Sequence, residues 1–545
     1  MNAADLLVEE LQARGVPFIA TLNGHGLDPL LWACRRAGMR MIDVRNEQAA
    51  AYMAEVTGRL TRSVGVCAVS GAVAHANAMT GVLNAWFDGA PMLLLTGITP
   101  LGRLGFGDFQ DFNPVPMATP FCKYARLLDA PERTAQIVHE AFAAATSGRP
   151  GPVHLSLPID VMSADVEQAD IAASPIRSGE VRLDGAATEE SIRTITQWIQ
   201  QAERPVLVAG SGLYYAHGER ALKALTDRME IPTVVPIWDR GCIHEPNPAF
   251  MGVVGAATGG ATLLPDADLV ILAGAEFDYR VGQLSPPVIH ADAKIVRIHA
   301  DAARLRRGLE AHVSVLASPA TVLDQLAQAC DAKRIAPKSN WLSEARQRRE
   351  DYRAECLAVS QRLDGGMNSG DVVLAIREVL SDDTLLLVDG GNIGQWFHQL
   401  LTDRYPGHWV TCGASGVVGW GLPGALAAKT LHPERPVILL SGDGSFTFTV
   451  AELECAARQD LNVVAVVADD EQWGISVTGH NQRYGEPLYS RLGPTRLDQV
   501  AEGFGCRGVR IESLDQLVPE LRTALTANQP TVIQVPIVPS SPNGT

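Results

Sequence analysis

The sequence lacks long hydrophobic runs and an excess of basic residues. No stretch of the 545-residue chain approaches the ~20 consecutive apolar residues of a membrane-spanning helix, so we expect no membrane insertion. With 45 Lys and Arg against 61 Asp and Glu, the formal net charge is −16. So acidic a chain is not expected to offer a broad surface to nucleic acid or to an anionic membrane.

Patterned cysteines, targeting segments and short-period repeats are lacking too. The nine cysteines form no CxxC pair and follow no regular spacing, which predicts reduced thiols in a cytoplasmic protein. Residues 1–15 are acidic and amphipathic, unlike a signal peptide. The last residues carry no lipidation motif. We therefore expect a cytoplasmic globular protein.

The sequence does contain a repeated alternation of short apolar runs with helical patterns. The runs are continuous, as in the strands of a parallel sheet covered on both faces. The predicted strands are residues 17–20, 41–44, 64–69, 92–96, 153–157, 205–209, 232–235, 268–273, 295–298, 384–388, 409–411, 436–440, 463–468 and 532–535. We predict an α/β fold of three doubly wound parallel-sheet domains in series, at residues 1–165, 190–335 and 367–540. A polar linker is expected at 166–190, and a charged helix at 341–362 precedes the last domain.

Two acidic turns follow neighbouring predicted strands of the last domain. Asp443 lies in a Gly-Asp-Gly-Ser turn after one strand, and Asp470 follows the next. A helix at 449–459 is predicted between them, with a capping box formed by Thr449 and Glu452. The carboxyl ends of parallel strands meet at one edge of a sheet, where two carboxylates beside glycine turns suit a Mg²⁺ ion that also binds phosphate. The alternative is an ordinary turn with solvated acids.

This segment resembles the thiamine-diphosphate signature, which usually reads GDG followed by an Asn pair. The resemblance implies that Asp443, Asp470 and the backbone carbonyl of Gln472 bind Mg²⁺. Asp470 stands where the family has its second asparagine, which keeps an oxygen ligand and adds a negative charge. Gly442, Gly444 and Ser445 would contact the cofactor's diphosphate.

Glu47 opens a predicted alanine-rich helix. By itself it is an acid in a first helical turn, favoured by the helix dipole. Its surroundings resemble the RHEQ…MAEG segment of the acetolactate synthase, pyruvate oxidase and benzaldehyde lyase family. The resemblance implies that Glu47 hydrogen-bonds the cofactor's aminopyrimidine ring and drives it to the imino tautomer that removes the C2 proton.

A glycine-rich turn at residues 70–77 resembles the family's SGPGATN segment. It keeps Gly71 and Asn77, which places Asn77 at the cofactor, but its middle differs and it is one residue longer. His75, inside this turn, is expected to be structural or to lie at the rim of the loop. The segment 84–97 resembles benzaldehyde lyase in particular.

Two residues in loops after predicted strands are candidates for contact with substrate. His25 is either a polar loop residue or, at the family position that faces the cofactor's reactive carbon, a proton shuttle. Gln110, in Gly-Asp-Phe-Gln-Asp, resembles the family glutamine that orients substrate, with a solvated loop amide as the alternative. Phe109 and Phe121 are either pocket walls or core residues.

Further cofactor contacts are predicted in the last domain. Gly391 and Asn392, in a second glycine turn, would bind the diphosphate. By resemblance, Val418 would wedge between the two cofactor rings, and Trp473 would line the pocket. In the middle domain the lone Gly-Ser-Gly at 210–212 is a weak dinucleotide signal. FAD is possible there but not indicated, and a flavin or nicotinamide oxidoreductase is the weakest alternative.

The resemblance covers nearly the whole chain, as a pyrimidine-binding, a middle Rossmann-like and a diphosphate-binding domain. It implies a thiamine-diphosphate- and Mg²⁺-dependent carboligase or lyase, acting on small 2-oxo acid, aldehyde or 2-hydroxy ketone substrates. The alternatives are a simple 2-oxo acid decarboxylase, an acyl-CoA lyase and a non-catalytic paralogue that only holds the cofactor. Because the family's cofactor bridges two chains, a homodimer is the smallest expected unit, and a homotetramer is favoured.

Overall fold

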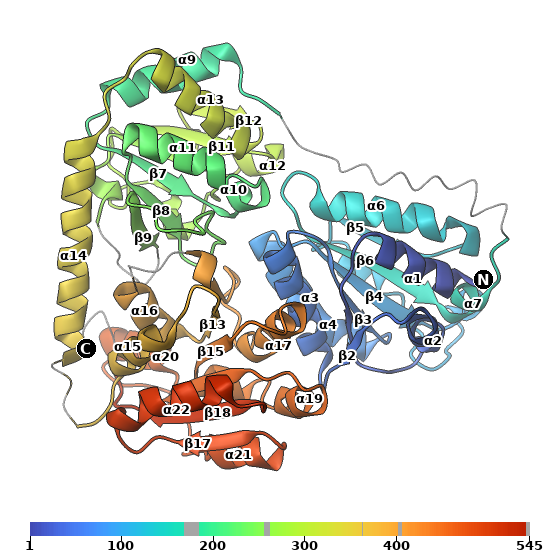
Figure 1. Cartoon of the computed structure of the whole chain (residues 1–545). Coiled ribbons are helices and arrows are strands. Elements are labelled where there is room, and N and C mark those ends of the chain that lie inside the picture. Colours follow the sequence, from blue (N-terminus) through green and yellow to red (C-terminus); the bar gives the residue numbers. More distant parts are fainter. Residues whose placement is uncertain (168–184, 256–261, 362, 364, 402–405, 541–545) are drawn as a thin grey trace.

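The computed structural model describes residues 1–167, 185–255, 262–361, 363, 365–401 and 406–540. Three six-stranded sheets follow one another along the chain, and every strand pairing in them is parallel. Figure 1 shows the three sheets in different parts of the molecule, with helices packed around each of them. The predicted fold class is therefore confirmed. The predicted linker falls largely outside the described residues.

The first sheet has the strand order β2-β1-β3-β4-β6-β5. Its strands are β1 (Ile19–Thr21), β2 (Met41–Asp43), β3 (Gly65–Val69), β4 (Met92–Ile98), β5 (Tyr124–Leu127) and β6 (Pro152–Pro158). The helices are α1 (Ala3–Ala13), α2 (Asp28–Ala37), α3 (Glu47–Thr61), α4 (Val73–Asp88), α5 (Val115–Ala118), α6 (Thr134–Thr146) and α7 (Ile159–Ser163).

The second sheet has the order β12-β11-β10-β7-β8-β9. Its strands are β7 (Pro205–Ala209), β8 (Thr233–Pro236), β9 (Phe250–Val254), β10 (Leu269–Ala273), β11 (Lys294–His299) and β12 (Val313–Leu316). Its helices are α9 (Glu189–Gln201), α10 (Ser211–Tyr215), α11 (Glu219–Met229), α12 (Ala302–Leu305) and α13 (Pro319–Ala332). The predicted charged helix is α14 (Ser339–Gln361), which leads to the third domain.

The third sheet has the order β14-β13-β15-β16-β18-β17, the same pattern as the first. Its strands are β13 (Leu385–Asp389), β14 (Trp409–Thr411), β15 (Val437–Gly442), β16 (Val464–Asp469), β17 (Arg507–Arg510) and β18 (Thr531–Pro536). The helices are α15 (Ser369–Val379), α16 (Gly391–Leu400), α17 (Gly421–Leu431), α18 (Asp443–Thr447), α19 (Glu452–Arg458), α20 (Gly474–Tyr484), α21 (Leu497–Gly503) and α22 (Leu514–Thr526).

All the predicted strands match observed ones to within two residues at each end. The strands that the sequence did not predict are β5, β9, β12 and β17, and each is an edge strand of its sheet. An edge strand pairs on one side only, so it need not carry a fully apolar run. β5 and β17, for example, are only half-buried along their whole length.

The first and third domains share one hydrophobic core. Helix α3 is buried from Ala49 to Arg59 and packs against α17, which follows β14 as α3 follows β2. A buried ion cluster lies in this contact. Arg59 lies 3.4 Å from Glu55 and 3.5 Å from Asp88, and Trp420 Nε1 donates to Glu55 over 2.7 Å. This cluster joins the two domains by buried polar contacts as well as by packing.

The same arginine also reaches the second domain. Arg59 Nη1 donates to the Thr411 carbonyl oxygen over 2.8 Å, and Nη2 donates to that of Trp238 over 3.2 Å. Tyr214 in turn donates to the Arg59 carbonyl oxygen over 2.7 Å. All three domains therefore meet at one buried guanidinium.

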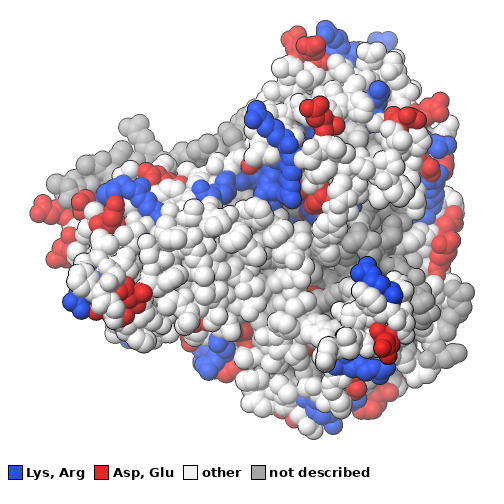
Figure 2. Space-filling model, turned by 180° about the vertical axis from the view of Figure 1, so that it is seen from behind, with Lys and Arg blue, Asp and Glu red and all other residues white. Residues whose placement is uncertain are grey.

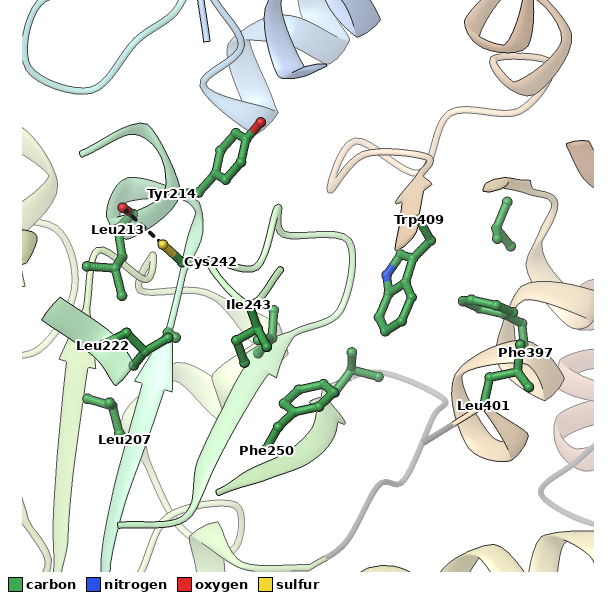
Figure 3. Close-up of a cluster of buried hydrophobic side chains, with 14 of the residues drawn as sticks. Leu207, Leu213, Tyr214, Leu222, Cys242, Ile243, Phe250, Phe397, Leu401 and Trp409 are labelled. Atoms are coloured by element: carbon green, nitrogen blue, oxygen red, sulfur yellow. Dashed lines mark hydrogen bonds between the residues drawn. The ribbon is translucent and has the colours of Figure 1, made fainter. Parts of the chain in front are cut away.

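A second hydrophobic cluster packs the middle domain against the third. Phe250 and Ile243 come from the middle domain, and Trp409 and Phe397 come from the third (Figure 3). The rings of Phe397 and Trp409 meet edge to face at 5.3 Å. The nine cysteines are all free, and all but Cys122 are buried. Within the described residues, no helix has the length and apolar character needed to cross a membrane.

The predicted capping box is wrong. Helix α19 begins at Glu452 after Ala451, and no side chain caps it. Thr449 instead donates its hydroxyl to the Gly419 carbonyl oxygen over 2.8 Å. The Glu452 carboxylate accepts backbone N–H groups of the first domain. Tertiary contacts have taken both side chains away from the local pattern.

Candidate active site

The candidate residues lie at the carboxyl ends of corresponding strands in the first and third sheets. In the first sheet, His25, Glu47, Asn77 and Gln110 follow β1, β2, β3 and β4. In the third, Asn392, Val418, Asp443 and Asp470 follow β13, β14, β15 and β16. The chain therefore presents two groups of polar residues on two sheets of the same topology.

Glu47 is held by its neighbours at the start of α3. Asn46 caps the helix by accepting the Gln48 N–H over 2.8 Å. Asn77, from α4, donates its side-chain amide to Glu47 Oε2 over 3.0 Å. Glu47 is half-buried and Asn77 is exposed. The structure thus brings together two residues that the sequence had assigned separately to the cofactor.

Close contact between glycines places the His25 loop against the end of β4. Gly26 has a left-handed backbone (φ 83°), and a Cβ there would lie 2.7 Å from the Ile98 nitrogen. The His25 ring meets Phe109 edge to face at 5.4 Å. Its Nε2 atom is buried and has no hydrogen-bond partner among the described residues. An unpartnered buried nitrogen of this kind is a natural contact for a ligand.

Gln110 lies in the same loop system. Its backbone is left-handed (φ 55°), which is uncommon for a residue other than glycine and typical of functional loops. A Cβ at Gly71 would lie 3.7 Å from the Gln110 carbonyl oxygen, so the loops after β3 and β4 touch. Like His25 Nε2, Gln110 Oε1 is buried without a partner in the described part of the chain.

Two further residues lie here: Asp108, which was not predicted as a site residue, and His75, whose burial differs from a position at the loop rim. Asp108 pairs with Arg103 at 2.7 Å, and this hydrogen bond, with a smaller contribution from His25, lowers the Asp108 pKa. The Gly-Asp-Phe-Gln motif was the available signal for Asp108. His75 is fully buried rather than at the loop rim. Its Nδ1 and His154 Nε2 bind the Thr96 hydroxyl at 2.9 and 3.1 Å.

Asp443 and Asp470 converge in the third domain. Burial and, next, the charge of Asp470 raise the pKa of Asp443 to about 7. Burial raises the pKa of Asp470 to about 6. Two carboxylates that repel each other in a buried place fit a divalent cation, which would relieve that repulsion. Gln472 donates its side-chain amide to Asp470 over 3.3 Å. The predicted role of the Gln472 carbonyl stays a prediction.

Glycines of the third domain form a cradle around these acids. Gly390 is left-handed (φ 92°), and a Cβ there would lie 3.0 Å from the Gly442 nitrogen and 3.2 Å from Ser445 Oγ. A Cβ at Gly444 would meet the Trp473 ring at 2.8 Å. The backbones of the two predicted diphosphate turns are therefore adjacent, at the start of helices α16 and α18.

The other predicted contacts are placed less directly. A Cβ at Gly474 would lie 3.1 Å from Asn392 Nδ2 and 3.2 Å from Asp470 Oδ2, so Asn392 does adjoin the acids. Its amide donates, however, to the Ser540 carbonyl oxygen of the C-terminal segment. Val418 is half-buried in the loop between β14 and α17. A cofactor would have to share or displace the Asn392 bond.

The two groups stay apart within one chain. None of the hydrogen bonds, ion pairs or ring contacts among the described residues joins Glu47, Asn77, His25 or Gln110 to the third domain. The described part of one chain therefore shows no direct contact that holds the two groups together.

The Gly-Ser-Gly turn of the middle domain has no spare amides. The N–H groups of Gly210 and Gly212 donate to Ala273 and Gly274 over 3.0 and 2.9 Å. The Ser211 N–H donates to the Asp239 carboxylate over 2.9 Å. A side-chain carboxylate of the protein therefore takes the position at this turn that a phosphate would need.

Comparison with known proteins matches one segment within each of the three sheets' parts of the chain. Residues 1–117 match the N-terminal TPP binding domain of the thiamine pyrophosphate enzymes, residues 192–326 their central domain, and residues 389–535 their C-terminal TPP binding domain. TPP, thiamine pyrophosphate, is the cofactor called thiamine diphosphate above.

Full-length relatives agree with these matches. A probable acetolactate synthase large subunit of Methanocaldococcus jannaschii is 28% identical over 99% of this chain and 92% of its own. The acetolactate synthase isozyme 1 large subunit of Escherichia coli is 27% identical over 98% and 94%. The 2-hydroxyacyl-CoA lyase 2 of Caenorhabditis elegans is 29% identical over 94% and 84%. The chain belongs to the thiamine-pyrophosphate-dependent enzymes and is of their acetolactate-synthase-like kind.

Proposed function

We propose that this enzyme is a carboligase that joins a 2-oxo acid to an aldehyde or to a second 2-oxo acid and gives a 2-hydroxy ketone product. More broadly, it is a thiamine-diphosphate-dependent carboligase or lyase. The observation that carries the proposal is the pair of residue groups at the ends of two sheets with one topology. One group contains an acid at a helix start, and the other contains two converging carboxylates in a glycine cradle.

The residues present fit thiamine diphosphate and Mg²⁺. Asp443 and Asp470 would hold the metal ion, and the turns at Gly391 and Gly444 would receive the diphosphate oxygens. Glu47, oriented by Asn77, would donate to or accept from the pyrimidine ring. When bound, the cofactor supplies a carbon nucleophile that makes or breaks the bond next to a carbonyl.

His25 and Gln110 would act on the substrate. Each carries a buried polar atom that lacks a protein partner. His25 Nε2 is placed to pass a proton to the new hydroxyl as it forms. The Gln110 amide can orient the carbonyl of the acceptor. Phe109, edge-on to His25, would exclude water on one side and so favour ligation over protonation.

Each site would take its two halves from two copies of the chain. Large apolar side chains are exposed beside both groups: Phe109 is 72% exposed in the first domain, and Phe448 and Tyr489 are 56% and 96% exposed in the third. Exposed apolar patches of this kind mark contact surfaces. Figure 2 shows a wide area with few charges on the reverse face. A homodimer is the minimum, a homotetramer is the favoured assembly, and the free cysteines suit a cytoplasmic enzyme.

An acyl-CoA lyase is the second candidate, because one close full-length relative carries that name. The test is a screen of 2-oxo acids and of 2-hydroxyacyl-CoA thioesters, with and without aldehydes, in the presence of thiamine diphosphate and Mg²⁺. Mass spectrometry identifies the products. A 2-hydroxy ketone supports the proposal. If every 2-oxo acid gives only an aldehyde, the enzyme is a decarboxylase and the proposal is wrong. If only the thioester is cleaved, the enzyme is an acyl-CoA lyase.

A further inference from the structure

A buried acid of the third domain holds the turn that precedes Glu47. Glu452 is the first residue of α19 and is 1% exposed. Its Oε1 and Oε2 accept the Arg45 N–H over 3.0 and 3.1 Å. The Asn46 N–H also bonds to this carboxylate. One side chain thus takes the two backbone donors that lead into helix α3.

Those donors belong to the residues that fix the direction of Glu47. Asn46 is the N-cap of α3, with an extended backbone (φ −149°, ψ 139°), and Glu47 follows it directly. A change in the torsion angles of Arg45 or Asn46 would swing the first turn of the helix, and with it the Glu47 carboxyl. The bond from Asn77 fixes the other end of that side chain. Glu452 is therefore placed to set the position of Glu47 without touching a ligand.

The Glu452 contact is more deeply buried than the other contacts between helix α19 and the segment from Asp43 to Asn46. Arg458 bonds to the Asp43 carbonyl oxygen over 2.7 Å, and Arg45 lies 3.9 Å from Glu454. These side chains are about one-third to one-half exposed, so water screens their attraction. Glu452 forms no ion pair within 4.0 Å among the described residues, and burial raises its pKa to about 8. A buried acid held only by backbone N–H groups is an unusual way to dock two domains.

We propose that Glu452 is a positioning residue for the proposed reaction: its carboxyl group holds the Arg45–Asn46 backbone so that Glu47 meets the pyrimidine ring. The proposal rests on the function proposed above, in which Glu47 activates the cofactor. It separates the task of fixing the acid from the task of binding the cofactor, because Glu452 contacts the backbone that precedes Glu47 and is not one of the residues assigned to the diphosphate or the metal ion.

The test compares Glu452→Gln with the control Glu454→Gln, an acid on the same helix that faces Arg458. The glutamine side chain keeps one acceptor oxygen but turns an NH₂ group toward the second backbone donor. The exchange of the cofactor's C2 proton with D₂O, followed by NMR, should slow by about 10- to 100-fold, as expected for a misplaced group. Cofactor affinity, measured by calorimetry, should change by less than ~3-fold, because no diphosphate or metal contact is lost.

Glu47→Gln is measured in parallel to separate the two proposals. If Glu47→Gln exchanges slowly and Glu452→Gln matches Glu454→Gln, the positioning role is refuted and the proposed function stands. If Glu47→Gln exchanges at the wild-type rate, both are refuted. Should Glu452→Gln fail to fold, Glu452→Asp decides, since it keeps the carboxylate and shortens its reach: wild-type exchange in that variant overturns the proposal.

Discussion

Removing the Arg59 guanidinium, which contacts all three domains, should lower the free energy of unfolding by an amount that depends on pH. Arg59→Met keeps an unbranched chain near the Trp420 ring, 5.4 Å from the guanidinium carbon. It removes the ion pair with Asp88, which keeps the Ala414 N–H as a donor, and it removes the guanidinium from the carbonyl oxygens of Thr411 and Trp238. Breaking a buried ion pair costs about 3–5 kcal/mol. Burial already raises the Glu55 pKa to about 7, so protonation of Glu55 relieves part of the penalty, and we expect about 3 kcal/mol near pH 7.5.

The pH dependence gives this prediction its sign. Without Arg59, the buried Glu55 carboxyl folds in its protonated form, whereas in the unfolded chain it is ionised above about pH 4.5. Neutralising one carboxyl costs about 1.4 kcal/mol for each pH unit above its unfolded pKa. The wild-type protein, whose Glu55 has a pKa of about 7, is itself stabilised by protonation over much of this range. The penalty of Arg59→Met relative to wild type should therefore shrink by only about 1 kcal/mol between about pH 7.5 and 5.5.

The assay is urea unfolding followed by circular dichroism at both pH values. The matched control is Arg458→Met, which removes an exposed arginine that links the first and third domains at Asp43, and exposed pairs contribute only about 0–1 kcal/mol. If the two variants lose equal free energy of unfolding, or if the loss for Arg59→Met does not change with pH, Arg59 does not balance the buried carboxyls as described.

The remaining predictions concern the candidate site and one buried pair of histidines. Asp443→Ala should lose the cofactor in calorimetry while Asp470→Asn keeps it, because only the first removes a metal ligand outright; normal binding by Asp443→Ala would contradict the metal assignment. Mixing Glu47→Gln with Asp443→Ala protein should restore activity that neither parent has, since half the sites of a mixed dimer have both faces intact; no recovery after verified subunit exchange would count against shared sites. His25→Ala should alter the ratio of aldehyde to ligated product more than cofactor affinity, and an unchanged ratio and rate would make His25 a loop residue. Burial lowers the His75 pKa to about 4, so stability that is present above pH 6.5 should fall by up to about 3 kcal/mol as the pH drops through 4; His75→Gln should flatten this decline in urea midpoints, and an equally steep decline would refute it.

The sequence predicted what local patterns encode. Continuous apolar runs mark the buried central strands. At residues 205–209, for example, the predicted strand has the same bounds as β7. The edge strand Arg507–Arg510, by contrast, carries two arginines and is only half-buried, so nothing local marks it. The acid and glycine motifs predicted which strand ends carry polar residues, and the sheets do bring Asp443 beside Asp470 and Glu47 beside Asn77.

Contacts between domains were not predictable from local patterns. Thr449 and Glu452 have the spacing of a capping box, yet one binds Gly419 and the other binds the turn at Arg45. Asp108 is a loop residue in sequence, and only the fold places it close enough to His25 for His25 to lower its pKa. In each case the partner lies on another element, so the pattern around the residue carries no record of it.

The free cysteines are distributed so that their alkylation would report local unfolding in each domain. Buried thiols lie in every domain, such as Cys67 in the first, Cys242 in the second and Cys455 in the third. Burial raises the pKa of Cys455 to about 12, and since only the thiolate reacts with alkylating reagents, such a thiol is inert until its surroundings unfold. Cys122 is half-buried, yet burial raises the pKa of its thiol to about 12 as well, so it belongs with the protected thiols. Timed alkylation with peptide mass analysis would therefore read the opening free energy of each domain separately, without an added label.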